Sequence, residues 1–594
     1  MLSGGTAILL LDNLEHLLPA AADAVARLRD AARGPVVVTS RERLQLAGER
    51  VYSVAPLATS DAVELFLART DALDVEGGEV GAVVELCARL DNLPLAVELA
   101  AARAGLLAPG EILSRLGGRL DRLRGGRDSD PRQQTLRATI AWSHELLDSA
   151  ERELFARLAV FAGGATLDTV DAVCGADLDV LGSLLDKSLV RRTGDRVWML
   201  ETIREFAAEQ LAVGSEAEKL KDGHALFYLV FAEDQDRKLM GPGQVAALQA
   251  LAVERDNLRA ALERLLERDP RSALRMVAAL HPFWFMRGHF HEAREMLAAA
   301  LERAGPEPSE ARASALVGAG LFAWERGDHG GSFVQFQEGL ACARTARSTR
   351  VEILALTMLS EGFTEELGRE QQIRFGEEAI ALARAHGHRW LLALAMGNHA
   401  NGMNQLGETA RATELWEEER RLARDVGDSY LTGISTNNLA WNALHAGNTV
   451  EARTRLNESL ELARALDDPR DNGTAIVNLG WVELLEGELD RARVCFEEGA
   501  ANARRLGRTR LGAEVIWGFA QAAAADGDAD RAARLAGAAT ALGTAVRFDP
   551  AASASFVHHV DDARAALGEQ VWQKAFSAGA ELGLDAALAL ALKS

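Results

Sequence analysis

The sequence predicts a mainly α-helical protein in which a small α/β segment precedes helical units and a long array of paired helices. Three observations predict this fold class. An apolar run from Ile8 to Leu11 leads into Asp12, and a second apolar run, Val36 to Val38, follows a helix-like segment. Three helices and a hairpin are expected between residues 134 and 215. Beyond residue 225 the sequence repeats itself at steps of about 40 residues.

The length and composition limit what the chain can be. With 594 residues it is too long for one hydrophobic core, so several domains are expected. We place an α/β segment at residues 1–55, a helical domain at 56–125, a winged helix at 134–215 and an α-solenoid at 225–594. A net charge of −22 repels phosphate backbones and disfavours a general role in binding nucleic acids. No secretion signal and no apolar run of about 20 residues is found, so we expect a cytoplasmic protein without membrane spans.

The α/β segment carries the first candidate site. The strand from Ile8 to Leu11, a helix over residues 21–32, the run Val36–Thr39 and the run Val51–Val54 alternate as parallel βαβ units do. Asp12 would then lie at the carboxyl end of a strand, where such sheets bind ligands. A phosphate-binding loop, G-x-x-x-x-G-K-[ST], normally comes earlier in the chain, but only seven residues precede Ile8 and none is lysine. The sequence therefore predicts a metal-holding motif without the phosphate-holding one.

The next two segments are predicted to be helical, with one hairpin. Asp61 is a plausible N-cap for a helix that begins at Ala62. In the winged helix, a helix over residues 178–190 would be the DNA reader, followed by a basic turn over residues 191–196. This helix offers Asp179, Asp186 and a single Lys187, whereas base readers need arginine, lysine, asparagine or glutamine. We therefore favour a structural or inhibitory role over DNA reading.

The repeats predict an α-solenoid of helix pairs. A turn between the first and second helix of each pair is expected at Gly288, Gly327, Gly368, Gly407, Gly447, Gly487 and Gly527. Asn398, Asn438 and Asn478 share one phase of the repeat, on the first helices, which line the inner surface of such solenoids. One interpretation is a ladder of amides that binds a peptide or ligand. The other, which we favour, is that small polar residues fit a tight contact between helices.

Five motifs in order make the chain resemble a known family. They are Ile8-Leu9-Leu10-Leu11-Asp12-Asn13-Leu14-Glu15-His16, Val36-Val37-Val38-Thr39-Ser40-Arg41-Glu42, Asn92-Leu93-Pro94-Leu95-Ala96, Gln134-Thr135-Leu136-Arg137-Ala138 and Met199-Leu200-Glu201-Thr202-Ile203. Together they resemble the STAND-class NTPase core (NB-ARC-like) of bacterial regulators of the AfsR/LuxR type, and the repeats are similar to the tetratricopeptide sensor of those proteins. The resemblance covers nearly the whole chain. Two parts of the family have no counterpart in this sequence: the P-loop half of the nucleotide domain and a separate DNA-binding output domain.

The resemblance implies a site for ADP or ATP with Mg²⁺. Asp12 would hold the Mg²⁺, because a hard dication prefers carboxylate oxygen. Arg41 resembles the arginine that reaches the terminal phosphate, and Pro94 would lie against the adenine. Leu200 stands where related switches have a histidine that contacts the β-phosphate. Hydrolysis is not expected, since the P-loop supplies most of the catalysis of phosphoryl transfer.

The predicted function is therefore non-catalytic signalling or transcriptional regulation. The solenoid would sense a protein partner or small effector, and a degenerate nucleotide switch with a winged helix would restrain the response. Two other classes stay open: a plain protein-binding scaffold of tetratricopeptide-like repeats, and an ATP-hydrolysing regulator whose P-loop lies outside this sequence. We also expect self-association through the strand from Ile8 to Leu11, because an apolar edge strand offers unpaired backbone groups.

Overall fold

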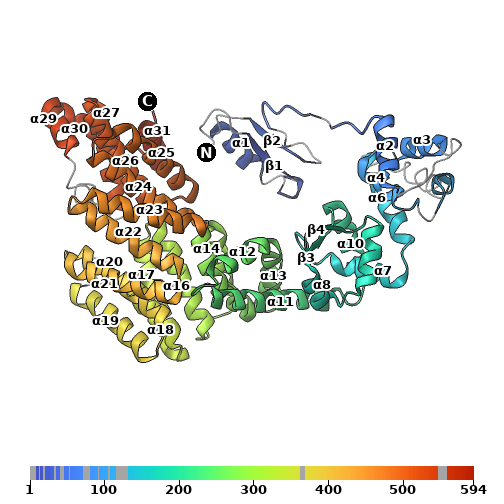
Figure 1. Ribbon diagram of the computed structural model, residues 1–594, viewed down its shortest axis with the longest axis horizontal. Helices are drawn as coiled ribbons and strands as arrows, with labels where there is room; N and C mark the ends of the chain where they lie inside the picture. The colour runs from blue at the N-terminus through green and yellow to red at the C-terminus, as the bar shows by residue number, and fades with distance from the viewer. Residues whose placement is uncertain are drawn as a thin grey trace. The chain divides into compact units, whose positions relative to one another are not determined.

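The structure is a computed structural model that describes residues 8–12, 14–17, 21–31, 35–40, 44, 46–52, 54–70, 80–90, 92–104, 107–114, 131–361, 368–545 and 558–593. The chain forms two compact units, one of residues 1–159 with 166–212 and one of residues 160–165 with 213–594. Figure 1 shows the helices and strands of both. The predicted fold class is confirmed: the protein is mainly helical, with a winged helix and an array of paired helices. In the described part of the chain, no helix combines the length and the apolar character that crossing a membrane requires.

The first unit opens with a parallel pair of strands. Its elements, in chain order, are β1 (Leu9–Leu11), the 3₁₀ helix η1 (Leu14–Leu17), α1 (Ala22–Ala31) and β2 (Val36–Val38). In the parallel pair, Leu10 lies opposite Val37. The βαβ prediction is confirmed for these elements. The predicted strand from Val51 to Val54 is wrong for its described residues, which form no strand; Tyr52 and Val54 are 89% and 79% exposed, so no apolar face there is buried against a sheet.

A small helical core follows. Its helices are α2 (Thr59–Arg69), α3 (Val80–Arg89), α4 (Pro94–Ala101) and α6 (Pro131–Glu145). Their buried apolar side chains, among them Phe66, Leu86, Val97 and Trp142, form one cluster. The predicted N-cap at Asp61 is wrong, because α2 begins at Thr59, three residues before the predicted Ala62, and Asp61 lies in its first turn. A carboxylate there still favours the helix, since it faces the positive end of the helix dipole.

The winged helix completes the first unit, except for residues 160–165 and Val213, which belong to the second. It comprises α7 (Ser149–Leu158), β3 (Ala165–Thr166), α8 (Leu167–Cys174), α9 (Leu178–Asp186), β4 (Arg191–Thr193), β5 (Arg196–Trp198) and α10 (Glu201–Val213), with strand order β3-β5-β4. The hairpin is antiparallel and pairs Arg192 with Val197. The predicted reader helix is shorter than expected: it ends at Asp186, because Ser188 adopts a left-handed conformation with φ +55°.

The second unit is the helical array. Its helices are α11 (Ala217–Lys238), α12 (Gln244–Val253), α13 (Arg255–Arg268), α14 (Pro270–Arg287), α15 (Phe290–Arg303), α16 (Glu310–Glu325), α17 (His329–Ala346), α18 (Thr349–Leu359), α19 (Arg369–Ala385), α20 (Arg389–Gln405), α21 (Thr409–Val426), α22 (Ser429–His445), α23 (Thr449–Ala465), α24 (Pro469–Leu485), α25 (Leu489–Leu506), α26 (Thr509–Ala525), α27 (Ala529–Ala545), α29 (His559–Leu567), α30 (Glu569–Ala580) and α31 (Leu584–Ala591). From α16 to α27 the even-numbered helices are the first helices of their pairs and the odd-numbered ones the second helices.

The turn glycines behave as predicted at six of seven positions. Gly288, Gly327, Gly407, Gly447, Gly487 and Gly527 have φ between +71° and +87°. Gly368 is the exception, because it has φ −59° and is the N-cap of α19. A second left-handed residue recurs where the second helices end, and it was not predicted. These residues are Arg347, Gly387, Gly427, Asp467 and Gly507. The sequence did not reveal this column because Arg347 and Asp467 stand where the other repeats have glycine.

Two glycine-to-alanine substitutions should have opposite effects on stability. Gly447 has φ +74°, so Gly447→Ala should cost about 1–2 kcal/mol, the penalty of a left-handed L-residue. Gly223 lies inside α11, so Gly223→Ala should stabilise by about 0.5–1 kcal/mol. No other group lies within 4 Å of a Cβ at either position, so packing does not confound the comparison. The measurement is the urea midpoint of the helical circular dichroism signal; a shift in the same direction for both would contradict the turn geometry.

Candidate functional site

The predicted nucleotide-binding residues fall on the first unit. Asp12 follows β1 and Thr39 follows β2, so the two side chains meet at the carboxyl ends of parallel strands. The Thr39 hydroxyl donates a hydrogen bond to Asp12 Oδ1, and Asp12 is exposed. Pro94 is the first residue of α4 and is also exposed. Arg41 lies outside the described residues, and no described contact joins Pro94 to Asp12.

The donor set at Asp12 fits a magnesium ion only in part. One carboxylate and one hydroxyl are hard oxygen ligands, and Mg²⁺ keeps several waters when few protein ligands are present. Over the described ranges, no group of three or more His, Cys, Asp or Glu side chains is arranged around a metal site.

The predicted self-association concerns the apolar run from Ile8 to Leu11. Ile8 is 66% exposed and Leu10 is 62% exposed. Both the metal site and the self-association stay predictions.

A carboxylate joins the helical core to the wing. Glu98 of α4 accepts hydrogen bonds from Arg69 of α2 at 3.0 Å and from Arg191 of β4 at 2.6 Å. Within the winged helix, Glu151 of α7 is 4% exposed and pairs with Lys187, the only lysine near α9. The exposed positions of α9 are Leu178, Asp179 and Asp186, so its outer surface is acidic. Arg191 and Lys187 are therefore both engaged inside the unit.

The second unit encloses a cavity of about 160 Å³ between its first helices. Its wall is mostly apolar and aromatic, with Phe285, Trp324 and Trp390 among the lining residues. A wider, open cleft of about 890 Å³ lies beside it, and both are lined by Asp236, Met240 and Arg350. Small-molecule sites are usually concave and apolar with a few convergent polar groups, and this cavity has that character.

The cavity is lined by one stripe of the repeat. Arg350, Trp390, Tyr430 and Arg470 stand at exact steps of 40 residues, and all four line it. Leu354, Leu394 and Ile434 form a second such column one helical turn later. This site was not predicted, although large side chains recur in the sequence at the second position of the first helices.

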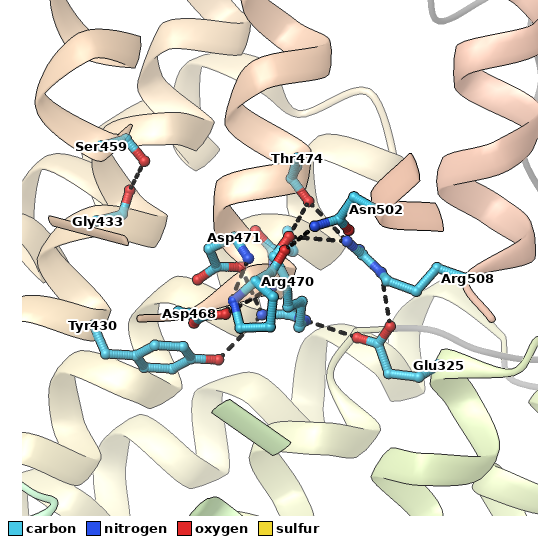
Figure 2. A network of polar contacts seen from close by, with 12 residues as sticks. Glu325, Tyr430, Gly433, Ser459, Asp468, Arg470, Asp471, Thr474, Asn502 and Arg508 are labelled. Atoms are coloured by element: carbon cyan, nitrogen blue, oxygen red, sulfur yellow. Dashed lines mark hydrogen bonds and ion pairs between the residues drawn. The ribbon is translucent and has the colours of Figure 1, made fainter. Parts of the chain in front are cut away.

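A buried ion cluster closes the array around the cavity. Figure 2 shows Glu325, the last residue of α16, reaching Arg470 of α24 and Arg508 beside α26. The distances from Glu325 are 2.8 Å to Arg470 Nε and 3.2 Å to Arg508 Nε. Burial raises the pKa of Glu325, but the two guanidinium groups outweigh it and hold this pKa below its usual value. Arg470 also lies 4.8 Å from the ring centre of Phe285.

The asparagine column divides between the two interpretations. Asn398 lines the cavity, and its Nδ2 donates to Leu394 O of its own helix. Asn438 Nδ2 donates to Asn401 Oδ1 of α20, and Asn478 Nδ2 donates to Asn437 Oδ1 of α22, both at 3.0 Å. These two amides thus bridge neighbouring first helices, as expected for a tight contact. Binding of a partner by the column stays a prediction.

Two family models match the chain. A winged helix-turn-helix domain model matches residues 147–212, and a tetratricopeptide repeat model matches residues 391–465. The chain contains both modules. The winged helix is thus assigned on its sequence as well as on its hairpin and helices. We use the name tetratricopeptide array for the described helices between residues 217 and 591, of which residues 391–465 carry the match.

The chain is similar to mycobacterial proteins over part of its length. It is 36% identical over 414 residues to a Mycobacterium tuberculosis protein named among the HTH-type transcriptional regulators, a match that covers 65% of this chain and 46% of the relative. It is 41% identical over 232 residues to an uncharacterized protein of the same organism, covering 36% of this chain and 58% of that protein. The chain therefore spans about half the length of these relatives.

Two solved structures show a more distant likeness. A STAND protein with a tetratricopeptide repeat sensor from Pyrococcus horikoshii is 14% identical, with a TM-score of 0.48 over 96% of this chain and 83% of that one. A Rap protein in complex with Competence and Sporulation Factor is 15% identical, with a TM-score of 0.39 over 61% of this chain and 100% of that one. Because both TM-scores lie below 0.5, neither likeness establishes a fold or a function for this chain.

Removing the central carboxylate of the ion cluster should destabilise the array. Glu325→Ala takes the shared carboxylate from Arg470 and Arg508, whose side chains are 15% and 13% exposed, while Arg470 keeps Asp471 at 2.8 Å. The loss should therefore be about 3 kcal/mol, the low end for breaking a buried pair. Glu263→Ala is the control, because Glu263 and its partner Arg259 are 55% and 58% exposed and such a pair contributes at most about 1 kcal/mol. Thermal melting followed by circular dichroism separates the two; equal melting temperatures would contradict a structural role of the cluster.

Proposed function

We propose that this protein is a cytoplasmic regulator of signal transduction or transcription whose tetratricopeptide array is the sensor. One observation carries the proposal: the array contains a largely apolar, partly open cavity, in the same chain as a winged helix. Clefts of this kind, mostly apolar with a few polar groups, are typical of sites for small molecules, which favours a sensor of small effectors over a scaffold that only binds proteins. The similarity to a protein named among the HTH-type transcriptional regulators supports the regulatory part. A ligand can shift such a regulator only if it prefers one conformation of the array.

The winged helix, in this proposal, passes the response on through contacts with protein rather than by reading DNA. The outer surface of α9 presents Asp179 and Asp186, which repel phosphates, and Lys187 is held by Glu151. In the wing, Arg191 is held by Glu98 of the helical core. A substitution of Glu98 would therefore remove an ion pair from both the helical core and the wing.

A DNA-binding assay tests this role of the winged helix. In fluorescence anisotropy with a labelled DNA duplex, the full chain should bind more weakly than about 100 μM near physiological salt, the weak end of non-specific binding. The double variant Asp179→Lys with Asp186→Lys should gain salt-dependent binding, because it replaces the acidic residues that face solvent on α9. Tight, sequence-selective binding by the unchanged chain would contradict the protein-contact role.

A degenerate nucleotide switch is the second candidate function, and the contact between Thr39 and Asp12 favours it. The strand pairing puts both oxygen atoms at the one sheet edge where nucleotide-binding folds hold phosphate and Mg²⁺. In this proposal Asp12 binds Mg²⁺ directly or through water, Arg41 approaches the terminal phosphate of ADP or ATP, and Pro94 borders the adenine. The chain's own groups would bind and orient the nucleotide without hydrolysing it.

Calorimetry with ADP and Mg²⁺ tests the switch. We expect a dissociation constant below about 100 μM for the full chain, and loss of binding in Asp12→Ala and in Arg41→Ala. Asp23→Ala is the matched control, since Asp23 is an exposed carboxylate in the first turn of α1 and should not affect binding. Binding that survives in Asp12→Ala would remove Asp12 from the site, and no binding at all would leave the sensor without a nucleotide switch.

A further inference from the structure

A buried carboxyl group lies in the wall of the cavity without a described partner. Glu419 of α21 is 2% exposed, and its Oε2 forms no hydrogen bond with any described residue. The carboxyl group lies against Gly397 of α20, where a Cβ would collide with it, so the missing side chain at Gly397 makes its room. Leaving such a group unsatisfied costs about 1–3 kcal/mol, which a bound ligand with a donor would recover.

The charges around the cavity leave it acidic. Both arginines of its wall are already paired: Arg350 donates to Asp236 at 3.1 Å and Arg470 to Glu325 at 2.8 Å. The carboxyl groups of Glu361 and Glu419 have no ion pair with a described residue, and Glu361 Oε1 accepts only the amide of Asn401 at 3.2 Å. The cavity wall therefore has two carboxyl groups without a cationic partner among the described residues, and each of its arginines already has a carboxylate partner.

Aromatic side chains complete the fit. Phe285, Trp324, Phe336 and Trp390 line the same cavity as Glu419. The faces of aromatic rings attract an ammonium group, and their area gives an apolar ligand a surface to pack against. A ligand here must therefore be compact, mostly apolar and positively charged at one end.

We propose that the cavity binds a small, mainly apolar amine whose ammonium group pairs with Glu419 and whose body packs against Phe285, Trp324 and Trp390. This proposal rests on the sensor function proposed for the array and names the chemical class of its effector. The open cleft beside the cavity is the way in, and the pair of Asp236 and Arg350 stands where the two spaces meet.

Binding of an amine should release a proton. Burial raises the pKa of Glu419 well above its usual value, and the negative charge of Asp428, the N-cap of α22, raises it further. From α20, the neutral Gly397 and Asn398 line the cavity with it. Glu419 thus holds a proton in the empty cavity, and the arriving ammonium ion drives that proton into solvent as the carboxylate forms. A neutral ligand has no such effect.

Titration calorimetry of the full chain with three matched probes tests the proposal. The probes are phenethylamine, phenethyl alcohol and phenylacetate, which share an aromatic body and carry a positive, neutral or negative end. Phenethylamine should bind at least about tenfold more tightly than the other two, the effect of one charge-assisted hydrogen bond. Its binding enthalpy should depend on the ionisation enthalpy of the buffer, which reports the released proton.

Two variants locate the ammonium group. Glu419→Gln should weaken binding of phenethylamine by about tenfold or more and remove the buffer dependence. Glu414→Gln, on the same helix but 68% exposed, should change neither. Equal affinity for phenethyl alcohol, or unchanged binding by Glu419→Gln, would overturn the proposal.

A stability measurement shows that Glu419→Gln folds and tests the protonation independently. The folded-state pKa of Glu419 lies above the ordinary 4.5, so its contribution to stability is complete below that pH and is lost as the pH rises through the folded-state pKa. Glu419→Gln should therefore melt at a higher temperature than the unchanged chain near neutral pH, and at a similar one near pH 4.5. A lower melting temperature of Glu419→Gln at neutral pH would contradict a buried carboxyl group that lacks a hydrogen-bond partner.

Hydrogen exchange separates this proposal from the sensor function on which it rests. If phenethylamine binds as described but exchange in the winged helix, residues 147–212, does not change, the amine site stands and the regulatory role fails. If phenethylamine does not bind, the amine site is wrong, whatever the exchange of the winged helix shows.

Discussion

The buried carboxylate of Glu325 joins helices of the array that lie far apart in the chain, together with the contacts of Arg287 with Asp467 and of Gln244 with Asp428. Tetratricopeptide repeats normally touch only their neighbours, so an array alone has no reason to surround a cavity. Here Glu325 meets Arg470 and Arg508, which are 145 and 183 residues away in the chain. Burying charges is unfavourable unless they are paired, and here Glu325 and Asp471, the latter 2.8 Å from Arg470, together balance the two arginines. The first helices between α14 and α24 are thereby held around a common space.

The same repeat builds both the packing of the array and the lining of its cavity. On one side of the first helices, glycines and amides allow close approach: a Cβ at Gly518 would lie 2.5 Å from the Phe496 ring. On the other side, the column of Arg350, Trp390, Tyr430 and Arg470 faces the cavity. Because the column varies in chemistry while the packing positions stay small, the array can carry a specific site without disturbing its repeat.

Local signals and periodicity predicted much of the fold but little of the candidate site. The strand pair, the hairpin and six turn glycines were predictable because each follows from neighbouring residues. The start of α2 was not, since Asp61 suits a first turn as well as a cap. The cavity and the Glu325 cluster were not predicted, because contacts between distant residues depend on how far the array curves at each repeat. Arg41 lies outside the described residues, so the nucleotide site rests on Asp12, Thr39 and Pro94.

The closing of the array by Glu325 has a consequence for its evolution. An open solenoid can gain or lose a repeat by duplication or deletion and merely grow longer or shorter. In this protein, one repeat more or less between Glu325 and Arg470 would shift both arginines by a full helix pair and remove them from Glu325. The number of helix pairs in that stretch is therefore locked, and only repeats outside it are free to vary.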